Sequence, residues 1–221
     1  MFARPHLNPL AKTLLLGLIA LNVTIEAVLF AADLGLVGTR QWRPLIYQNA
    51  AFWAGLLHNW RPNYTAQPWT MFITYAFLHG GIMHLLGNML TLWLIGRMAI
   101  VRAGPKGFVL IYVLSAIGGA LMFGALTLSA RPMVGASGAL FGLVGAILYW
   151  RWSDRRRLGL DQWPVLKTAL ILGVLNLLLW LLMGGLLAWE THLGGFIAGW
   201  LGAAALAFFR KRRRARRRSA R

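Results

Sequence analysis

Six apolar stretches, five of them near the length of a membrane-crossing helix, dominate this chain of 221 residues. They run over residues 10–32, 82–101, 108–128, 136–150, 165–187 and 192–209. A helix needs about 20 mostly apolar residues to cross the hydrocarbon core of a bilayer. Charged residues make up only 13% of the chain, whereas a soluble domain carries about 25%. We therefore predict an all-α polytopic membrane protein, with six transmembrane helices in one membrane domain over residues 1–209.

Basic residues are distributed unevenly between the two sides of the predicted spans. With the N-terminus inside, 19 of the 23 Lys and Arg residues fall on the inner side. The four on the outer side are Arg40, Arg43, Arg61 and Arg131. Because inner loops of membrane proteins are enriched in Lys and Arg, we expect both termini in the cytoplasm and the loop over residues 33–81 outside.

Nine basic residues in the terminal segment 210–221 contribute much of the net charge of +18. In a soluble protein such a charge favours nucleic-acid binding, but here it directly follows an apolar stretch. A basic segment in this position is typical of a cytoplasmic tail that attracts anionic lipid. We expect a lipid partner at this tail and no nucleic acid.

The long outer loop, residues 33–81, holds Trp42, Trp53, Trp60 and Trp69. Indole rings favour the headgroup region of a bilayer, and long loops in compact folds usually have structure of their own. We expect a membrane-associated loop of short helices that lie in the interface between the first and second helices.

Polar side chains gather around the start of the second stretch, where His79 precedes it and His84 and Asn88 lie within it. Polar groups inside a span are costly and usually functional. Residues four apart share one face of a helix, so His84 and Asn88 point to the same place. These residues alone leave open a structural role, in which both side chains bond neighbouring backbone.

The stretch over residues 136–150 measures only about 22 Å as a helix, against a hydrocarbon core of about 30 Å. We expect this helix to begin below the outer surface. Ser137 in its first turn then lies beside spare backbone N–H groups and the positive end of the helix dipole, where a developing oxyanion is stabilised. Serines flanked by glycine are also common where spans simply pack tightly.

His192 stands at the outer end of the sixth stretch, and Gly195 and Gly199 follow at a spacing that favours close helix approach. If that surface faces the glycines of the fourth stretch, Ser137 and His192 come to a similar depth. They are then a candidate nucleophile and base. The fourth-stretch glycines are Gly138, Gly142 and Gly145.

Three motifs occur in order along the chain: His79-xxxx-His84-xxx-Asn88, Gly135-x-Ser137-Gly138 and His192-xx-Gly195-xxx-Gly199. With these motifs the chain resembles the rhomboid family of intramembrane serine proteases, in its minimal six-helix bacterial form. The resemblance covers nearly the whole chain. It implies a six-helix rhomboid bundle and an endopeptidase that cleaves single-pass transmembrane substrates near the outer face of the membrane. It also implies lateral substrate entry near the second and fifth helices.

The resemblance implies a role for each motif residue. Ser137 is expected to be the nucleophile and His192 the general base, in a dyad without an acidic third member. Asn88 and His84, with the backbone N–H of Ser137, are expected to hold the oxyanion. Phe141 stands where the family carries an aromatic ring that packs against the histidine. The supporting residues are His79, Gly135, Gly138, Gly195 and Gly199, and neither a metal nor a cofactor is implied.

One departure from the family concerns the outer loop. The family often has a Trp-Arg pair just before the second span, where this chain reads Gln67-Pro68-Trp69-Thr70. This puts the packing of the loop in doubt and leaves the dyad untouched. Glu190 on a continuing helix projects away from His192, so we expect Glu190→Gln to keep activity. We interpret three further polar residues as structural: Asn22, Glu26 and Asn176.

Other function classes fit these residues less well. A metalloprotease needs ligands at a spacing such as HExxH, which is absent around His79 and His84. An aspartyl mechanism needs two carboxylates in the membrane, and only Glu26 lies well inside a span. A transporter would place its polar groups near the midplane. The main alternative is a catalytically inactive rhomboid-like protein that binds or retains membrane clients. A short chain without a targeting segment favours the bacterial inner membrane.

Overall fold

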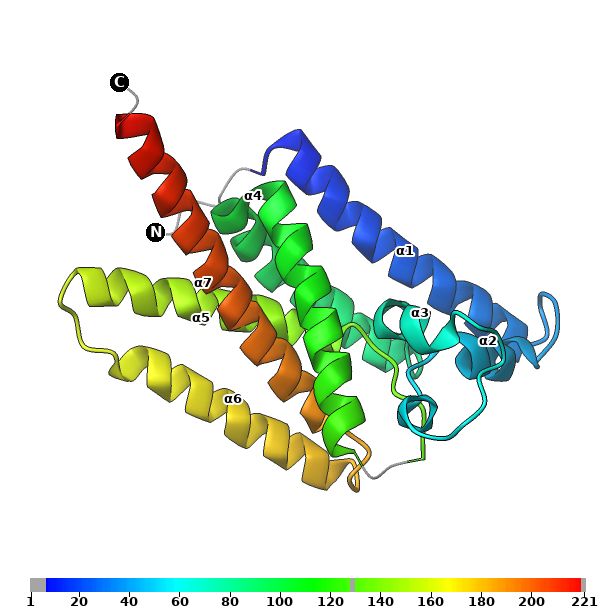
Figure 1. The fold of residues 1–221 in the computed structure, drawn as a ribbon. Helices are drawn as coiled ribbons and strands as arrows, with labels where there is room; N and C mark the ends of the chain where they lie inside the picture. Colours follow the sequence, from blue (N-terminus) through cyan, green and yellow to red (C-terminus); the bar gives the residue numbers. More distant parts are fainter. Residues whose placement is uncertain (1–6, 128–129, 220–221) are drawn as a thin grey trace.

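In the computed structural model, which describes residues 7–127 and 130–219, helices make up most of the chain (Figure 1). The only β pairing in these residues is an isolated antiparallel bridge between Phe52 and Met133. The predicted all-α class is therefore confirmed. Leu128, where the third apolar stretch was expected to end, and the basic residues Arg4 and Arg221 lie outside the described residues.

Helix α1 spans Pro9–Asp33 and begins with a defined cap. Asn8 accepts a hydrogen bond of 2.7 Å from the Ala11 backbone N–H. Pro9 occupies the first helical position, where its missing N–H has no intrahelical partner to lose. Leu15 of α1 is fully buried beside Gly96 of α4, which attaches α1 to the side of the bundle.

Helix α4, Ile82–Leu126, contains two of the predicted spans. At Gly104 the backbone adopts φ 74° and ψ 164°, and Pro105 follows. A positive φ suits glycine, and proline has no N–H for the helical ladder, so the two residues break the helix. The two halves of α4 fold back on each other (Figure 1). A methyl group on Gly96 would lie 3.7 Å from the Phe108 side chain. In a straight helix these two residues, twelve apart in sequence, would be separated by about 18 Å. The connection that we expected over residues 102–107 is therefore reduced to one non-helical residue, Gly104.

Helices α5, α6 and α7 span Ser137–Arg157, Trp163–Leu182 and Trp189–Ser219. Their ends differ from the predicted ones. Helix α6 stops before the predicted residue 187, because Gly184 and Gly185 both have positive φ. Helix α7 begins before His192 and continues past residue 209, since the Ala, Arg and Lys residues there are strong helix formers. The described part of the predicted tail is therefore a continuation of α7.

The outer loop contains short helices, as predicted, and it packs onto the bundle. Phe52 is fully buried, with its ring edge-to-face against Phe72, Tyr75 and Phe123 at centroid distances of 5.1, 6.2 and 5.9 Å. The position of this loop on the outer side and in a membrane interface stays a prediction. The elements are α2 (Trp42–Ala50), η1 (Ala54–Leu57), α3 (Gln67–Thr74) and η2 (Tyr75–Phe77), where η denotes a 3₁₀ helix.

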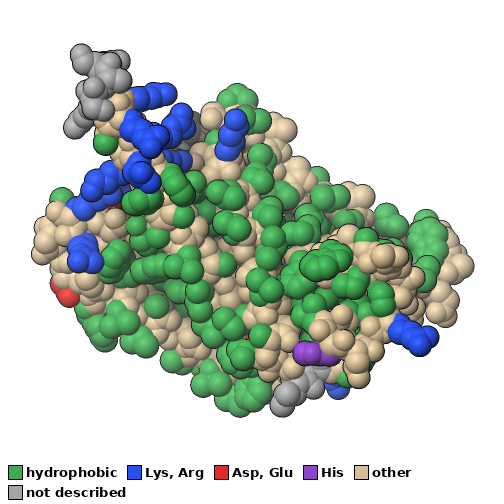
Figure 2. All heavy atoms as spheres, in the orientation of Figure 1, with side chains coloured by type: hydrophobic (Ala, Val, Ile, Leu, Met, Phe, Trp, Pro, Cys, Tyr) green, Lys and Arg blue, Asp and Glu red, His purple; other side chains and the backbone are tan. Residues whose placement is uncertain are grey.

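Hydrophobic side chains cover much of the molecular surface (Figure 2). Helix α6 is the extreme case, because Val165 is its only buried residue. An apolar surface of this extent suits lipid rather than water. Among the described residues, α1, α4, α6 and α7 are long and apolar enough to cross a membrane by length and composition. Helix α5 does not meet that criterion, so the count of six spans stays a prediction.

Candidate active site

Ser137 and His192 come from different helices and meet at one end of the bundle. Ser137 is the first residue of α5, and His192 lies in the first turn of α7. His192 Nε2 lies 2.9 Å from Ser137 Oγ, which is a hydrogen-bond distance. His192 is buried and Ser137 is half-buried. In this arrangement the imidazole is able to accept the hydroxyl proton of the serine.

The backbones of α5 and α7 approach each other at glycines. A methyl group on Gly195 would overlap the carbonyl oxygen of Gly138, and one on Gly199 would overlap that of Gly142. Any side chain larger than hydrogen would therefore push the two helices apart. The contact that we predicted between these glycine surfaces is present, and it sets the depth at which His192 meets Ser137.

The ring of Phe141 stacks on the imidazole of His192, with centroids 4.2 Å apart and planes 8° from parallel. Phe141 lies on α5 one turn after Ser137, so the helix that carries the hydroxyl also supports the face of the imidazole. The stacking restricts tilting of the ring.

His84 and Asn88 line the segment that leads into α5. Gly135 has φ 127°, and a methyl group there would lie 2.7 Å from His84 Cε1 and 3.6 Å from Asn88 Nδ2. The backbone N–H of Gly80 donates to His84 Nδ1 at 3.2 Å. A neutral imidazole has one N–H, so His84 Nε2 is left as a donor. Asn88 Nδ2 is buried and has no partner among the described residues. Two N–H donors thus lie beside Gly135, two residues before Ser137.

His79 is fully buried and packs against His84. Its ring contacts the His84 ring edge-on, with centroids 5.2 Å apart, and neither ring nitrogen of His79 has a partner among the described residues. Its backbone carbonyl accepts hydrogen bonds from Tyr47 at 2.5 Å and Arg43 at 3.2 Å. His79 therefore supports the position of His84 and ties it to the outer loop.

Arg43 is a residue whose importance the sequence reasoning missed. Its guanidinium contacts Glu26 at 2.9 Å and Asp33 at 2.6 Å, so it joins α2 to α1. Burial works against its charge, but hydrogen bonds to Glu26, Asp33 and Tyr47 outweigh this and hold the pKa of Arg43 above its ordinary value. A carboxylate inside a span usually pairs with a cation. The presence of Glu26 in a span therefore indicated that one of the four outer arginines would be its partner.

The contacts of Asn22 and Glu26 agree with their structural interpretation, although the two residues have separate partners. Glu26 bonds to Arg43 of the outer loop, whereas Asn22 donates to the Leu18 carbonyl of its own helix at 2.8 Å.

The doubt about the packing of the outer loop is resolved, because Gln67 of the segment that departs from the family bonds to other residues of the loop. The amide of Gln67 donates to the Gln48 carbonyl at 2.6 Å and accepts from the Asn63 N–H at 2.7 Å.

We expect Arg43→Gln to reduce the free energy of unfolding by about 2 kcal/mol, below the roughly 3–5 kcal/mol of a fully buried pair because Arg43 and Asp33 are partly exposed. The cost arises because Glu26, only 1% exposed, loses its counter-charge. Thermal unfolding in detergent measures it. The double variant Arg43→Gln/Glu26→Gln should recover part of the loss, and a double variant no more stable than the single one would contradict the explanation.

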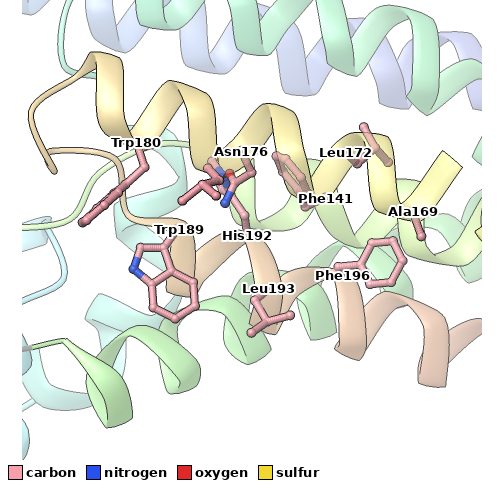
Figure 3. Close-up of a pocket in the computed structure, with 11 residues that line it drawn as sticks. Phe141, Ala169, Leu172, Asn176, Trp180, Trp189, His192, Leu193 and Phe196 are labelled. Atoms are coloured by element: carbon pink, nitrogen blue, oxygen red, sulfur yellow. The ribbon is translucent and has the colours of Figure 1, made fainter. Parts of the chain in front are cut away.

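Asn176, which we interpreted from the sequence as structural, lies against the site. Its Oδ1 lies 2.5 Å from His192 Nδ1. Figure 3 shows Asn176 on α6 beside His192 on α7, and both residues line a pocket of about 640 Å³. The pocket is lined by Phe141, Ala169, Leu172, Gly173, Asn176, Leu177, Trp180, Trp189, His192, Leu193 and Phe196.

Glu190 is buried, but its carboxylate makes no hydrogen bond to His192 in the described structure, and Oε2 has no partner there. We expect Glu190→Gln to cleave substrate within about threefold of the wild-type rate, a barrier change below about 0.7 kcal/mol. Cleavage rates of the two proteins under identical conditions provide the test. A loss as deep as that of Ser137→Ala would instead reveal a triad.

The fold and this site define an all-helical membrane protein with a serine and a histidine paired at two helix N-termini. The Rhomboid domain family model matches residues 65–209. The chain therefore belongs to the rhomboid family and is an integral membrane protein.

Three named relatives illustrate the similarity. Rhomboid protease GluP of Bacillus subtilis (strain 168) is 34% identical over 138 residues, which are 62% of this chain and 26% of that protein. RHOMBOID-like protein 5 of Arabidopsis thaliana is 39% identical over 134 residues, or 58% and 40%. Rhomboid-type serine protease 2 of Emericella nidulans is 33% identical over 135 residues, or 59% and 25%. The chain thus spans less than half the length of each of these relatives.

Proposed function

We propose that this chain is an intramembrane serine endopeptidase that cleaves single-pass transmembrane substrates near the outer face of the membrane. The observation that carries the proposal is the 2.9 Å contact between His192 Nε2 and Ser137 Oγ at the start of α5. A serine in this position has a base within reach and the unpaired N–H groups of a helix N-terminus beside it. Membership of a family that includes named proteases supports the same reaction.

The proposed reaction is acyl transfer to water. His192 accepts the hydroxyl proton of Ser137 through Nε2 while the serine oxygen attacks a substrate peptide carbonyl. The imidazolium then gives the proton to the leaving amine. Water enters from the outer side and hydrolyses the acyl-enzyme, with His192 again acting as the base that accepts its proton.

We assign stabilisation of the oxyanion to three donors. These are Asn88 Nδ2, which lacks another partner among the described residues, His84 Nε2, and the backbone N–H of Ser137 at the helix start. Fixed donors in a site of low dielectric stabilise developing charge without reorganising, and one such donor is typically worth a factor of about 10² to 10³ in rate.

The substrate must unwind before attack, because the carbonyls of an intact transmembrane helix are bonded within that helix. We therefore propose substrates with small or helix-weakening residues near the outer end of their span. Lateral entry between the first half of α4 and α6 follows from the family resemblance and belongs to the same proposal.

We further propose that both ends of the chain lie in the cytoplasm of a bacterium, with this protein in the inner membrane and residues 33–81 outside. On the face seen in Figure 2, Lys and Arg side chains gather near the end of α7. The exposed residues Arg210, Lys211, Arg212 and Arg213 contribute to this charge, which supports binding of anionic lipid.

The alternative is an inactive relative that binds or retains membrane clients. Such a protein has no need of a serine within hydrogen-bond distance of a buried histidine. The pairing of Ser137 with His192 therefore favours the protease.

Purified protein in liposomes with a generic single-pass substrate tests the proposal. We expect one cut near the outer end of the substrate span, located by mass spectrometry, and covalent labelling of Ser137 by a fluorophosphonate. Failure to cleave several substrates, together with no labelling of Ser137, would favour the client-binding alternative.

A further inference from the structure

Asn176 is the only side chain with a hydrogen-bond acceptor between Ala169 and Leu182 of α6. Leaving an amide unbonded in apolar surroundings costs about 1–3 kcal/mol, so the direction of this side chain is informative. Leu172, Asn176 and Trp180 form one stripe of the helix, and all three line the pocket that contains His192 (Figure 3). The amide thus faces the site, while most neighbouring side chains of α6 are exposed.

The two nitrogens of His192 have different partners. Nδ1 lies 2.5 Å from Asn176 Oδ1, and Nε2 lies 2.9 Å from Ser137 Oγ. An amide oxygen accepts and does not donate, so Nδ1 must carry the ring proton in this contact. Nε2 is then the unprotonated nitrogen, which a base needs to present to the serine.

The contact with Asn176 complements the stacking of Phe141. Stacking of two parallel rings limits tilting of the imidazole but leaves it able to rotate within its own plane. A hydrogen bond from Nδ1 to a fixed acceptor opposes that rotation. The two contacts, from α5 and α6, together hold the ring in the orientation that directs Nε2 at Ser137.

We propose that Asn176 is a positioning residue, which holds His192 in the tautomer and orientation that activate Ser137. It acts through the imidazole and touches neither the substrate nor the reacting atoms. The inference rests on the proposed function and adds to the dyad a third residue from α6.

Two variants of Asn176 and one control on the same helix test this role. Asn176→Leu is close in size but has no acceptor, and it should lower kcat by about 10- to 100-fold with little change in KM. Asn176→Asp keeps an acceptor oxygen at the same place and should retain most of the rate. Thr168→Val removes a hydroxyl whose one hydrogen bond within the described structure goes to the Pro164 carbonyl of its own helix, and it should cleave like wild type.

The tautomer is measured directly by ¹⁵N NMR of histidine-labelled protein, with the His192 signal assigned from His192→Ala. We expect protonated Nδ1 in the Ser137→Ala background, which needs no catalysis, and a mixture of tautomers when Asn176→Leu is added. Unchanged Nδ1 protonation and unchanged kcat in Asn176→Leu would overturn the inference. A loss of thermal stability without a change in tautomer would also overturn it. These outcomes differ from failure of the proposed function. In that case the wild-type protein would neither cleave substrate nor be labelled at Ser137 by the fluorophosphonate.

Discussion

Ser137→Ala is expected to lower substrate cleavage by about 10⁴-fold or more, because the acyl-enzyme cannot form without the hydroxyl. His192→Ala should lose a comparable factor, since at neutral pH the serine hydroxyl is a weak nucleophile without the base 2.9 Å away. The two groups act as a unit, so the double variant should be no slower than either single one. Initial rates in liposomes, with fluorophosphonate labelling in parallel, measure these effects.

Matched controls separate the site from the rest of the protein. Ser153→Ala changes a serine near the other end of α5, and His58→Ala changes an exposed histidine of the outer loop. Both should cleave like wild type and, together with Ser137→Ala, unfold at about the wild-type temperature. His192→Ala should unfold at a lower temperature, because it loses the contacts with Asn176 and Phe141. Undiminished cleavage by Ser137→Ala would refute the proposed nucleophile, and labelling that persists in it would show that another residue reacts with the probe.

Gly199→Ala is expected to destabilise the protein by about 3 kcal/mol, the upper end of typical overpacking costs. The added methyl group would overlap the carbonyl oxygen of Gly142, and backbone atoms cannot move aside as a flexible side chain does. Helices α5 and α7 would have to separate, which moves His192 away from Ser137. A displacement of about 1 Å at a reacting pair costs about 100-fold in rate, so cleavage should fall as well.

Gly202→Ala is the matched control on the same helix. A methyl group there would meet only the side chains of Ile111 and Leu114, at 3.7 Å, which is an ordinary contact. Because alanine favours a helix over glycine by about 1 kcal/mol, this variant should be as stable as wild type or more so. Thermal unfolding in detergent compares the two variants. Equal stability of Gly199→Ala and Gly202→Ala would show that the α5–α7 contact is looser than described.

The local patterns of the sequence predicted much of the fold and the site. Apolar stretches mark helices because a bilayer requires internally bonded backbone, and His84 and Asn88 share a face because four residues nearly complete a helical turn. The glycines at 138, 142, 195 and 199 signal a close helix contact that the structure contains. Helix ends were predicted less well, since the glycines at 184 and 185 end α6 early and the basic tail continues α7.

The sequence by itself determined the membrane class and the approximate position of the helices, because each follows from hydrophobicity or spacing within one segment. The pairing of Ser137 with His192 was expected from the glycine spacings and the family resemblance, and the structure places the two side chains 2.9 Å apart. Only the tertiary structure decided which partners Arg43 and Asn176 have. Arg43 bonds across 17 residues to Glu26, and Asn176 bonds across 16 residues to His192, between helices whose relative rotation no local pattern specifies. An isolated polar residue in an apolar helix signals that a partner exists, but packing of the helices determines which group it meets.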